Sequence, residues 1–154
     1  MMGSAGRYAC RFLLGAVLVF SGFVKAVDPM GTCIKLEEYL KAFGMANIFY
    51  DWVILLAAIA LAALEFAIGV YLTIGIRRKV ASTVALILMG IMTPLTLYLW
   101  IANPVSDCGC FGDALKLTHA ETFFKNLILL AMAVVTFRWK RQMRRLITPK
   151  SDWL

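Results

Sequence analysis

Charged residues are scarce in this chain: they make up 16% of its 154 residues, whereas hydrophobic residues make up 62%. Soluble domains average about 25% charged and roughly 45–50% apolar residues, so the composition excludes an ordinary soluble domain. The chain has one histidine and no internal repeat or low-complexity segment. Its length allows one compact bundle and leaves no room for a second folded domain.

Four apolar runs are long enough to cross a bilayer as helices. They cover residues 12–27, 52–76, 80–101 and 123–137, and the last reaches the required length of about 20 residues only with neighbours such as Thr122 and Trp139. Each run must be helical in lipid, because no water is present to satisfy the backbone polar groups. The first run lacks a small-x-small cleavage site, which favours an uncleaved span over a signal peptide. The predicted fold is an all-α integral membrane four-helix bundle.

Lysine and arginine are divided unequally between the two sides that these spans define. The more basic side carries Arg7, Arg11, the turn at residues 77–79, and Arg138, Lys140, Arg141, Arg144, Arg145 and Lys150. The positive-inside rule then places both termini in the cytoplasm and the two other loops in the periplasm. The net charge of +7 therefore reflects membrane topology, and we predict no nucleic-acid partner. We divide the chain into a four-span domain, residues 1–138, and a basic cytoplasmic tail, residues 139–154.

The first outer loop contains an amphipathic pattern. Its apolar residues recur at helical spacing, and charged residues lie between them: Leu36, Tyr39, Leu40 and Phe43 alternate with Lys35, Glu37, Glu38 and Lys41. This spacing predicts a helix at the outer membrane interface, with Gly44 as its end. Such a helix caps the bundle or recruits a partner.

The second outer loop contains the strongest local motif, Asp107-Cys108-Gly109-Cys110-Phe111-Gly112-Asp113. Two cysteines separated by one glycine close only a small, strained ring, and strain makes a disulfide easier to reduce. Disulfides persist in the periplasm, where the topology places this loop. Lys125 nearby favours a thiolate, whereas Asp107 and Asp113 oppose it. The motif suits the transfer of a disulfide to another protein.

Three other interpretations of the cysteine pair remain open. The pair could staple the loop, Cys33 could cross-link to Cys108 or Cys110, or both cysteines could bind a metal together with His119. Zinc usually has four ligands, so a two-cysteine motif with a lone histidine is weak evidence, and we predict no metal site. Cys10, near the inner end of the first span, is expected to be a reduced packing residue.

Glu65 lies near the middle of the second apolar run. An acidic residue at that depth is costly and is a functional candidate by default. Lys25 is one possible partner, but Glu65 lies roughly 20 Å along its helix from Asp51. Direct pairing therefore requires the lysine stem to reach inward. The alternative partners are Ser21, Thr93, Thr96 and Tyr98, and small residues such as Ala62, Ala63 and Gly69 permit close helix packing.

Asn126 is expected about one turn into the fourth span, beside Lys125 and below the cysteine loop. We predict that its side chain ties this loop to the bundle through hydrogen bonds to the loop backbone.

Taken together, these residues resemble the DoxX/MauE group of small four-span bacterial membrane proteins. The matching segments are Ser21-Gly22-Phe23-Val24-Lys25 with Asp28-Pro29, then Leu64-Glu65-Phe66-Ala67-Ile68-Gly69, and finally Asp107-Cys108-Gly109-Cys110-Phe111-Gly112 followed by Lys125-Asn126. The last segment is similar to the methylamine-utilisation MauE branch. The resemblance implies a four-helix bundle and a role in disulfide formation or protein maturation in the periplasm. That role falls on Cys108 and Cys110, with Lys125 and Asn126 as neighbours.

The sequence therefore supports two main hypotheses. In the first, Cys108 and Cys110 are the catalytic pair of a thiol–disulfide component that exchanges with a thioredoxin-like or substrate protein, with a quinone as the candidate electron carrier. In the second, the chain is a non-enzymatic accessory or scaffold subunit of a larger membrane complex. A weaker third hypothesis is a binding site for a small lipid-like molecule centred on Glu65. Whether the chain is an enzyme stays open at this point.

Overall fold

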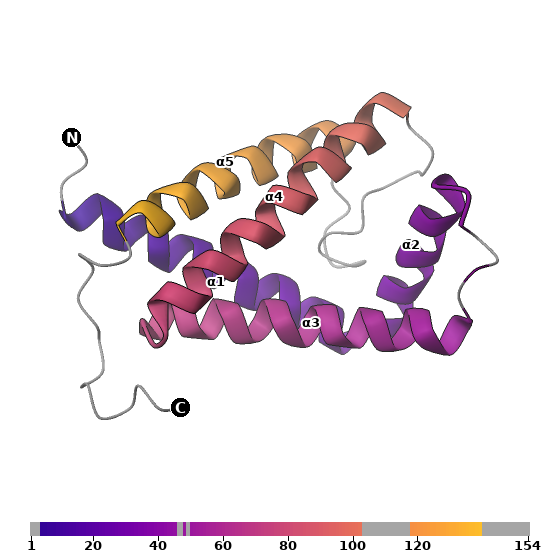
Figure 1. Cartoon of the computed structure of the whole chain (residues 1–154), viewed down its shortest axis with the longest axis horizontal. Helices are drawn as coiled ribbons and strands as arrows, with labels where there is room; N and C mark the ends of the chain where they lie inside the picture. Colours follow the sequence, from indigo (N-terminus) through magenta and orange to yellow (C-terminus); the bar gives the residue numbers. More distant parts are fainter. Residues whose placement is uncertain (1–3, 46–47, 49, 103–117, 140–154) are drawn as a thin grey trace.

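The computed structural model describes residues 4–45, 48, 50–102 and 118–139, and all of its regular structure in these ranges is helical. The helices are α1 (Ser4–Val27), α2 (Pro29–Ala42), α3 (Asp51–Ile74), α4 (Arg78–Ala102) and α5 (His119–Arg138). Four of them, α1, α3, α4 and α5, are long and apolar enough to cross a membrane. The predicted all-α membrane bundle with four spans is confirmed (Figure 1).

The last span begins earlier than its apolar run suggested. Thr118 caps the N-terminus of α5: its hydroxyl accepts from Glu121 N, and the Glu121 side chain accepts from Thr118 N. This reciprocal capping box satisfies two backbone N–H groups that a helix start leaves unpaired. The cap adds one turn of helix ahead of Phe123, so the span gains its missing length mainly at its N-terminal end.

The amphipathic helix also begins earlier than expected. Asp28 alone separates α1 from α2 and caps α2, because its side-chain oxygen accepts a hydrogen bond from Gly31 N at 2.9 Å. Pro29 occupies the first turn of α2. Proline is well suited to that position because its missing N–H has no helical acceptor there. After Ala42, Gly44 adopts a positive φ of 73°, a conformation that glycine reaches without strain. The predicted end of this helix at Gly44 is confirmed within two residues.

The spans form two closely packed pairs, α1 with α3 and α4 with α5, joined by one apolar core. The core draws residues from all four spans, among them Leu14, Leu72, Ala85 and Ala133. The basic turn between α3 and α4 is as tight as predicted, because Gly75 reverses the chain at a φ of 83°. From this turn α3 and α4 diverge, and α2 lies near the open end of the wedge (Figure 1).

The helix α2 closes this end of the bundle. Tyr39 packs against Leu99 of α4, and Phe43 stacks on Tyr98 with ring centroids 5.1 Å apart. Offset aromatic stacking of this kind adds about 0.5–1.5 kcal/mol to the burial of the rings. The apolar face of α2 therefore faces the spans, as its sequence pattern predicted.

Candidate functional site

Glycines bring the backbones of α1 and α3 into direct contact. A Cβ on Gly22 would lie 2.5 Å from Phe66 N, and a Cβ on Gly69 would lie 2.5 Å from Val19 N. No real Cβ occupies such positions, so only glycine fits at both. Small residues at the interface are the usual means by which membrane helices approach closely, because lipid supplies no hydrophobic force between them.

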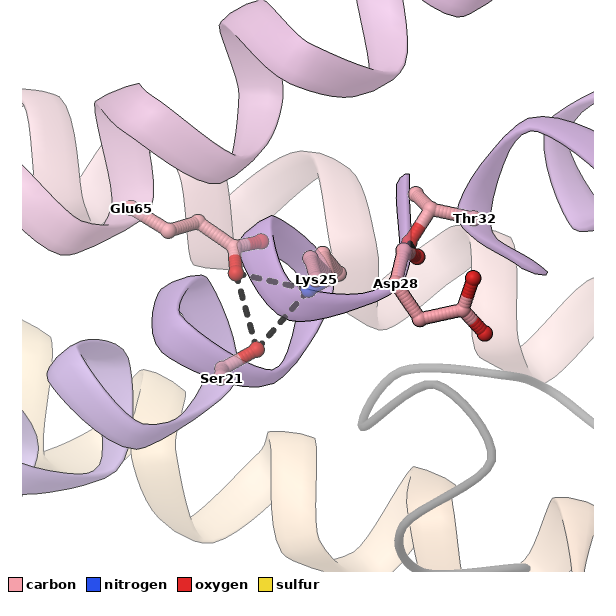
Figure 2. Close-up of polar contacts among 5 residues, drawn as sticks. All are labelled: Ser21, Lys25, Asp28, Thr32 and Glu65. Atoms are coloured by element: carbon pink, nitrogen blue, oxygen red, sulfur yellow. Dashed lines mark hydrogen bonds and ion pairs between the residues drawn. The ribbon is translucent and has the colours of Figure 1, made fainter. Parts of the chain in front are cut away.

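Lys25, Glu65 and Ser21 form a buried polar cluster beside this contact (Figure 2). Lys25 Nζ donates to Glu65 Oε2 at 2.6 Å and to Ser21 Oγ at 2.8 Å. Ser21 Oγ donates in turn to the same Oε2 at 2.8 Å. Lys25 is 6% and Glu65 is 3% exposed. The three groups close a triangle that links α1 to α3 inside the bundle.

The register of α1 and α3 explains why Lys25 reaches Glu65. Gly22 lies against Ala62 and Phe66, so the end of α1 meets the middle of α3 and not its beginning. The first turns of α3 continue beyond α1 and pack on α2 (Figure 1). Measuring depth from Asp51 therefore overstated the separation of the two charges. The Lys25 side chain reaches inward to Glu65, as direct pairing required. Ser21 is a second hydrogen-bond partner of Glu65. Thr93 and Thr96 instead donate to backbone carbonyls of their own helix.

Asp28, the acid closest to Lys25 along the chain, is not part of this cluster. Its carboxylate points away from Lys25 and caps α2, while its carbonyl oxygen accepts from Thr32 Oγ1 at 3.3 Å (Figure 2). Glu65 is therefore the counter-ion of Lys25. A charged side chain near the middle of a membrane span costs about 2.5–3.5 kcal/mol on insertion scales, and mutual pairing with hydrogen bonds is the usual way to offset that cost.

A partly open cavity of about 70 Å³ lies against the cluster on the side of α2. It occupies the wedge between the diverging helices α3 and α4. The surface of its lining is mostly apolar, although charged and hydroxyl-bearing side chains also border it: Lys25, Thr32, Lys35, Leu36, Tyr39, Leu61, Glu65, Met92, Leu95 and Thr96. A second cavity of about 30 Å³ reaches the same ion pair from the side of α5. Both spaces exceed the volume needed to hold a water molecule.

The second cavity brings Lys125 and Asn126 to the Lys25–Glu65 pair. Both residues line it together with Ser21, Lys25 and Glu65. Lys125 is half-buried, and Asn126 is 3% exposed. The sequence-based prediction places Lys125 and Asn126 with the cysteine loop. It places Glu65 and Lys25 apart from them, within the membrane. The bundle joins these two groups of candidate residues.

Asn126 makes a contact that the sequence did not predict. It lies about two turns into α5, not one, because the helix starts at His119. Its Nδ2 donates to Thr96 Oγ1 of α4 at 3.4 Å. This bond joins two spans. The expected bonds to the loop backbone fall on residues outside the described ranges.

The motif residues Cys108, Cys110, Asp107 and Asp113 also lie outside the described residues, so their roles stay predictions. The other two cysteines, Cys10 and Cys33, are free thiols. Burial, and then the negative charges of Glu37 and Asp51, raise the pKa of Cys33. Since the thiolate is the reactive form, Cys33 is a poorer nucleophile than an ordinary cysteine. Within the described ranges, no group of three or more acidic, histidine or cysteine side chains is placed to hold a metal ion.

Neither the close contact made by the glycines of α1 nor most of the cavity lining was predicted from the sequence. Gly15 and Gly22 are seven residues apart, as are Ala62 and Gly69. This spacing returns to the same helix face every two turns, so it was a readable signal for the α1–α3 contact. Ala63, which we expected in that contact, is exposed instead. The cavity had no sequence signal, because it depends on the angle at which α4 leaves α3.

Two comparisons with known proteins support this description. The family profile described as "Methylamine utilisation protein MauE" matches residues 4–138. A protein of Flavobacterium psychrophilum named "Protein TlpB" is 22% identical over 135 residues, which is 84% of this chain and 36% of that relative. The chain thus spans about a third of the length of this relative. No solved structure matches the chain.

Proposed function

The chain belongs to the methylamine-utilisation MauE family and is a multi-pass membrane protein, and on this basis we propose that it is a periplasm-facing component of thiol–disulfide exchange. Cys108 and Cys110 carry the exchange. The observation that best supports this proposal is that the family match, residues 4–138, includes the Cys-Gly-Cys motif. The partner would be a periplasmic protein with a dithiol, such as a thioredoxin-like protein.

The exchange between the motif disulfide and the partner dithiol conserves electrons and protons, so it needs no additional oxidant. A thiolate of the partner attacks one sulfur of the Cys108–Cys110 disulfide and forms a mixed disulfide, releasing the other cysteine as a thiolate. The second thiol of the partner then displaces the first cysteine. The partner leaves with a disulfide, and the motif keeps two electrons and two protons as a dithiol. A strained ring favours this direction, because opening it relieves strain.

The geometry of the bundle is consistent with this role. The motif belongs to the connection between Ala102 and His119, the ends of α4 and α5 that lie on the same side as α2 and the end of α1 (Figure 1). Aromatic contacts join these ends, with Trp100 and Phe123 ring centroids 5.6 Å apart. The two described ends of the connection that carries the motif are thus held together at one end of the bundle. Lys125 and the Lys25–Glu65 pair lie in the bundle on this side.

Trapping of a partner tests this proposal. With Cys110 replaced by serine, the Cys108 thiolate can still attack the disulfide of the oxidised partner, which is the second exchange step run in reverse, and Cys110 is not there to resolve the mixed disulfide. We therefore expect a covalent adduct in whole cells after acid quenching and alkylation of thiols. The variant Cys108→Ser/Cys110→Ser is the matched control and should give no adduct. Cys33→Ser should leave the adduct unchanged, because the raised pKa of Cys33 opposes its reaction. Absence of any adduct, with normal assembly of the double variant, would favour an accessory subunit with a stapled loop.

We further propose that this protein lies in the bacterial inner membrane with both termini in the cytoplasm. A green fluorescent protein fused after Leu154 should fluoresce, and an alkaline phosphatase fused there should be inactive, because the positive-inside rule places the basic tail in the cytoplasm. A phosphatase fused after Pro104, in the connection between α4 and α5, should be active. The reverse pattern would place the cysteine motif in the cytoplasm and exclude a periplasmic partner.

A further inference from the structure

We infer that the cavity between α2, α3 and α4 binds the head of a lipid-soluble quinone. The two carboxylate oxygens of Glu65 have different surroundings. Lys25, which is also the ion-pair partner, and Ser21 both donate to Oε2 (Figure 2). No described residue donates a hydrogen bond to Oε1. A carboxylate accepts up to about four hydrogen bonds. Glu65 therefore keeps accepting capacity beside the cavity that it lines.

Lys25 provides the complementary group. An ammonium has three donors, and the bonds to Ser21 and Glu65 use two of them. Lys25 lines the same cavity, so one end of this space offers both a donor from Lys25 and an acceptor from Glu65. A ligand that accepts a hydrogen bond in one state and donates one in another matches both groups. The carbonyl of a quinone and the hydroxyl of its quinol have these two properties.

The rest of the cavity selects an apolar ring. Leu36, Leu61, Met92 and Leu95 supply aliphatic surface, and the side is partly open. Lys35 also lines the cavity, and its ammonium is paired with Glu38. A space of about 70 Å³ admits the carbonyl edge of one ring, with the remainder extending through the opening. A phospholipid headgroup is too large, and a fatty-acid carboxylate would lie beside the negative charge of Glu65. Small apolar pockets with a few placed polar groups are typical of such ligand sites.

This inference rests in part on the proposed function, because a dithiol left by disulfide exchange must be reoxidised. The balance is simple: the Cys108 and Cys110 thiols lose two electrons and two protons and form a disulfide, and the quinone gains both and becomes a quinol. Binding of the quinone head itself depends only on the cavity. The two proposals can therefore fail separately.

Photolabelling tests the quinone site. Full-length protein in phospholipid nanodiscs would be irradiated with a short-tailed azidoquinone, and labelled peptides identified by mass spectrometry. We expect labels on the cavity-lining segments of α2, α3 and α4 and their loss when excess unlabelled quinone competes. Leu61→Trp fills the cavity and should reduce labelling about tenfold or more, equivalent to about 1.4 kcal/mol of binding free energy. Leu64→Trp is the matched control, since Leu64 is 44% exposed on the lipid-facing side of α3, and should leave labelling unchanged.

The outcomes separate this inference from the proposed function. Labels confined to lipid-facing residues, or labelling that competing quinone does not reduce, would overturn the quinone site, as would equal labelling of Leu61→Trp and the parent protein. If mixed disulfides are still trapped in that case, disulfide exchange stands without this acceptor. If the Cys108→Ser/Cys110→Ser variant labels normally and Cys110→Ser traps no partner, the quinone site stands and disulfide exchange is wrong.

Discussion

Replacing Glu65 with leucine is expected to destabilise the bundle by about 3–5 kcal/mol, because the buried Lys25 ammonium then has no counter-ion. The pair is joined at 2.6 Å, and both side chains are less than a tenth exposed. The measurement is unfolding in mixed micelles of increasing dodecyl sulfate content, followed by far-ultraviolet circular dichroism. Lys25→Met should have a similar effect, since among the described residues it leaves the Glu65 carboxylate with Ser21 as its one donor.

The double variant Lys25→Met/Glu65→Leu separates the charge from the packing. Replacing both partners of a buried ion pair by apolar residues is often neutral or stabilising by about 1–4 kcal/mol, so we expect most of the lost stability to return. If the double variant is as unstable as either single variant, the residues stabilise the bundle by shape and not as an ion pair. A double variant that is stable but no longer binds the quinone analogue would assign the pair to ligand binding.

Gly22→Ala is expected to have the second-largest effect, a loss of about 1–3 kcal/mol through overpacking. The added methyl group would meet the backbone of Phe66 and the Ala62 carbonyl oxygen at 2.5 and 2.8 Å, and backbone cannot move aside as a flexible side chain can. The two helices must separate, which also lengthens the Lys25–Glu65 contact. The same unfolding measurement applies.

Gly90→Ala is the matched control for this effect. Gly90 also lies inside a span, but a Cβ there has no atom within 4 Å. Alanine is favoured over glycine within a helix by about 0.5–1 kcal/mol, so this substitution should stabilise the protein slightly. Opposite signs for the two substitutions would confirm the α1–α3 contact. A loss of equal size at both positions would mean that helix flexibility, not close packing, governs them.

Much of the fold could be predicted because each span carries its own signal. Long apolar runs mark α3, where Glu65 is the one charged residue within the run, and α4, and the basic turn between them marks their hairpin. Gly44 marks the end of α2, whereas its start at Asp28-Pro29 was not predicted. The apolar run marks α5 only from Phe123, because the capping box of Thr118 and Glu121 extends the helix ahead of that run and hydropathy does not register a cap.

The candidate site was predicted in its members but not in its arrangement. Lys25, Glu65, Ser21 and Asn126 are polar residues at or within apolar runs, and that contrast identifies them. Their contacts depend on how far α1 extends along α3 and on where α4 diverges, and both are set by close packing at Gly22 and Gly69. Such tertiary geometry has no local signature. The cavity is a product of the same geometry and could not be predicted for that reason.

The Lys25–Glu65 pair also imposes an order on biogenesis. Forty residues separate its partners, and synthesis at about 5–20 residues per second delivers Glu65 a few seconds after Lys25. During this interval Lys25 has no counter-ion from α3, and its long stem, two residues from the end of the helix at Val27, lets its charge stay at the membrane surface. Only when α3 enters the bilayer can both charges be buried together. Lateral assembly of α1 against α3 is thus coupled to the arrival of the third helix from the ribosome.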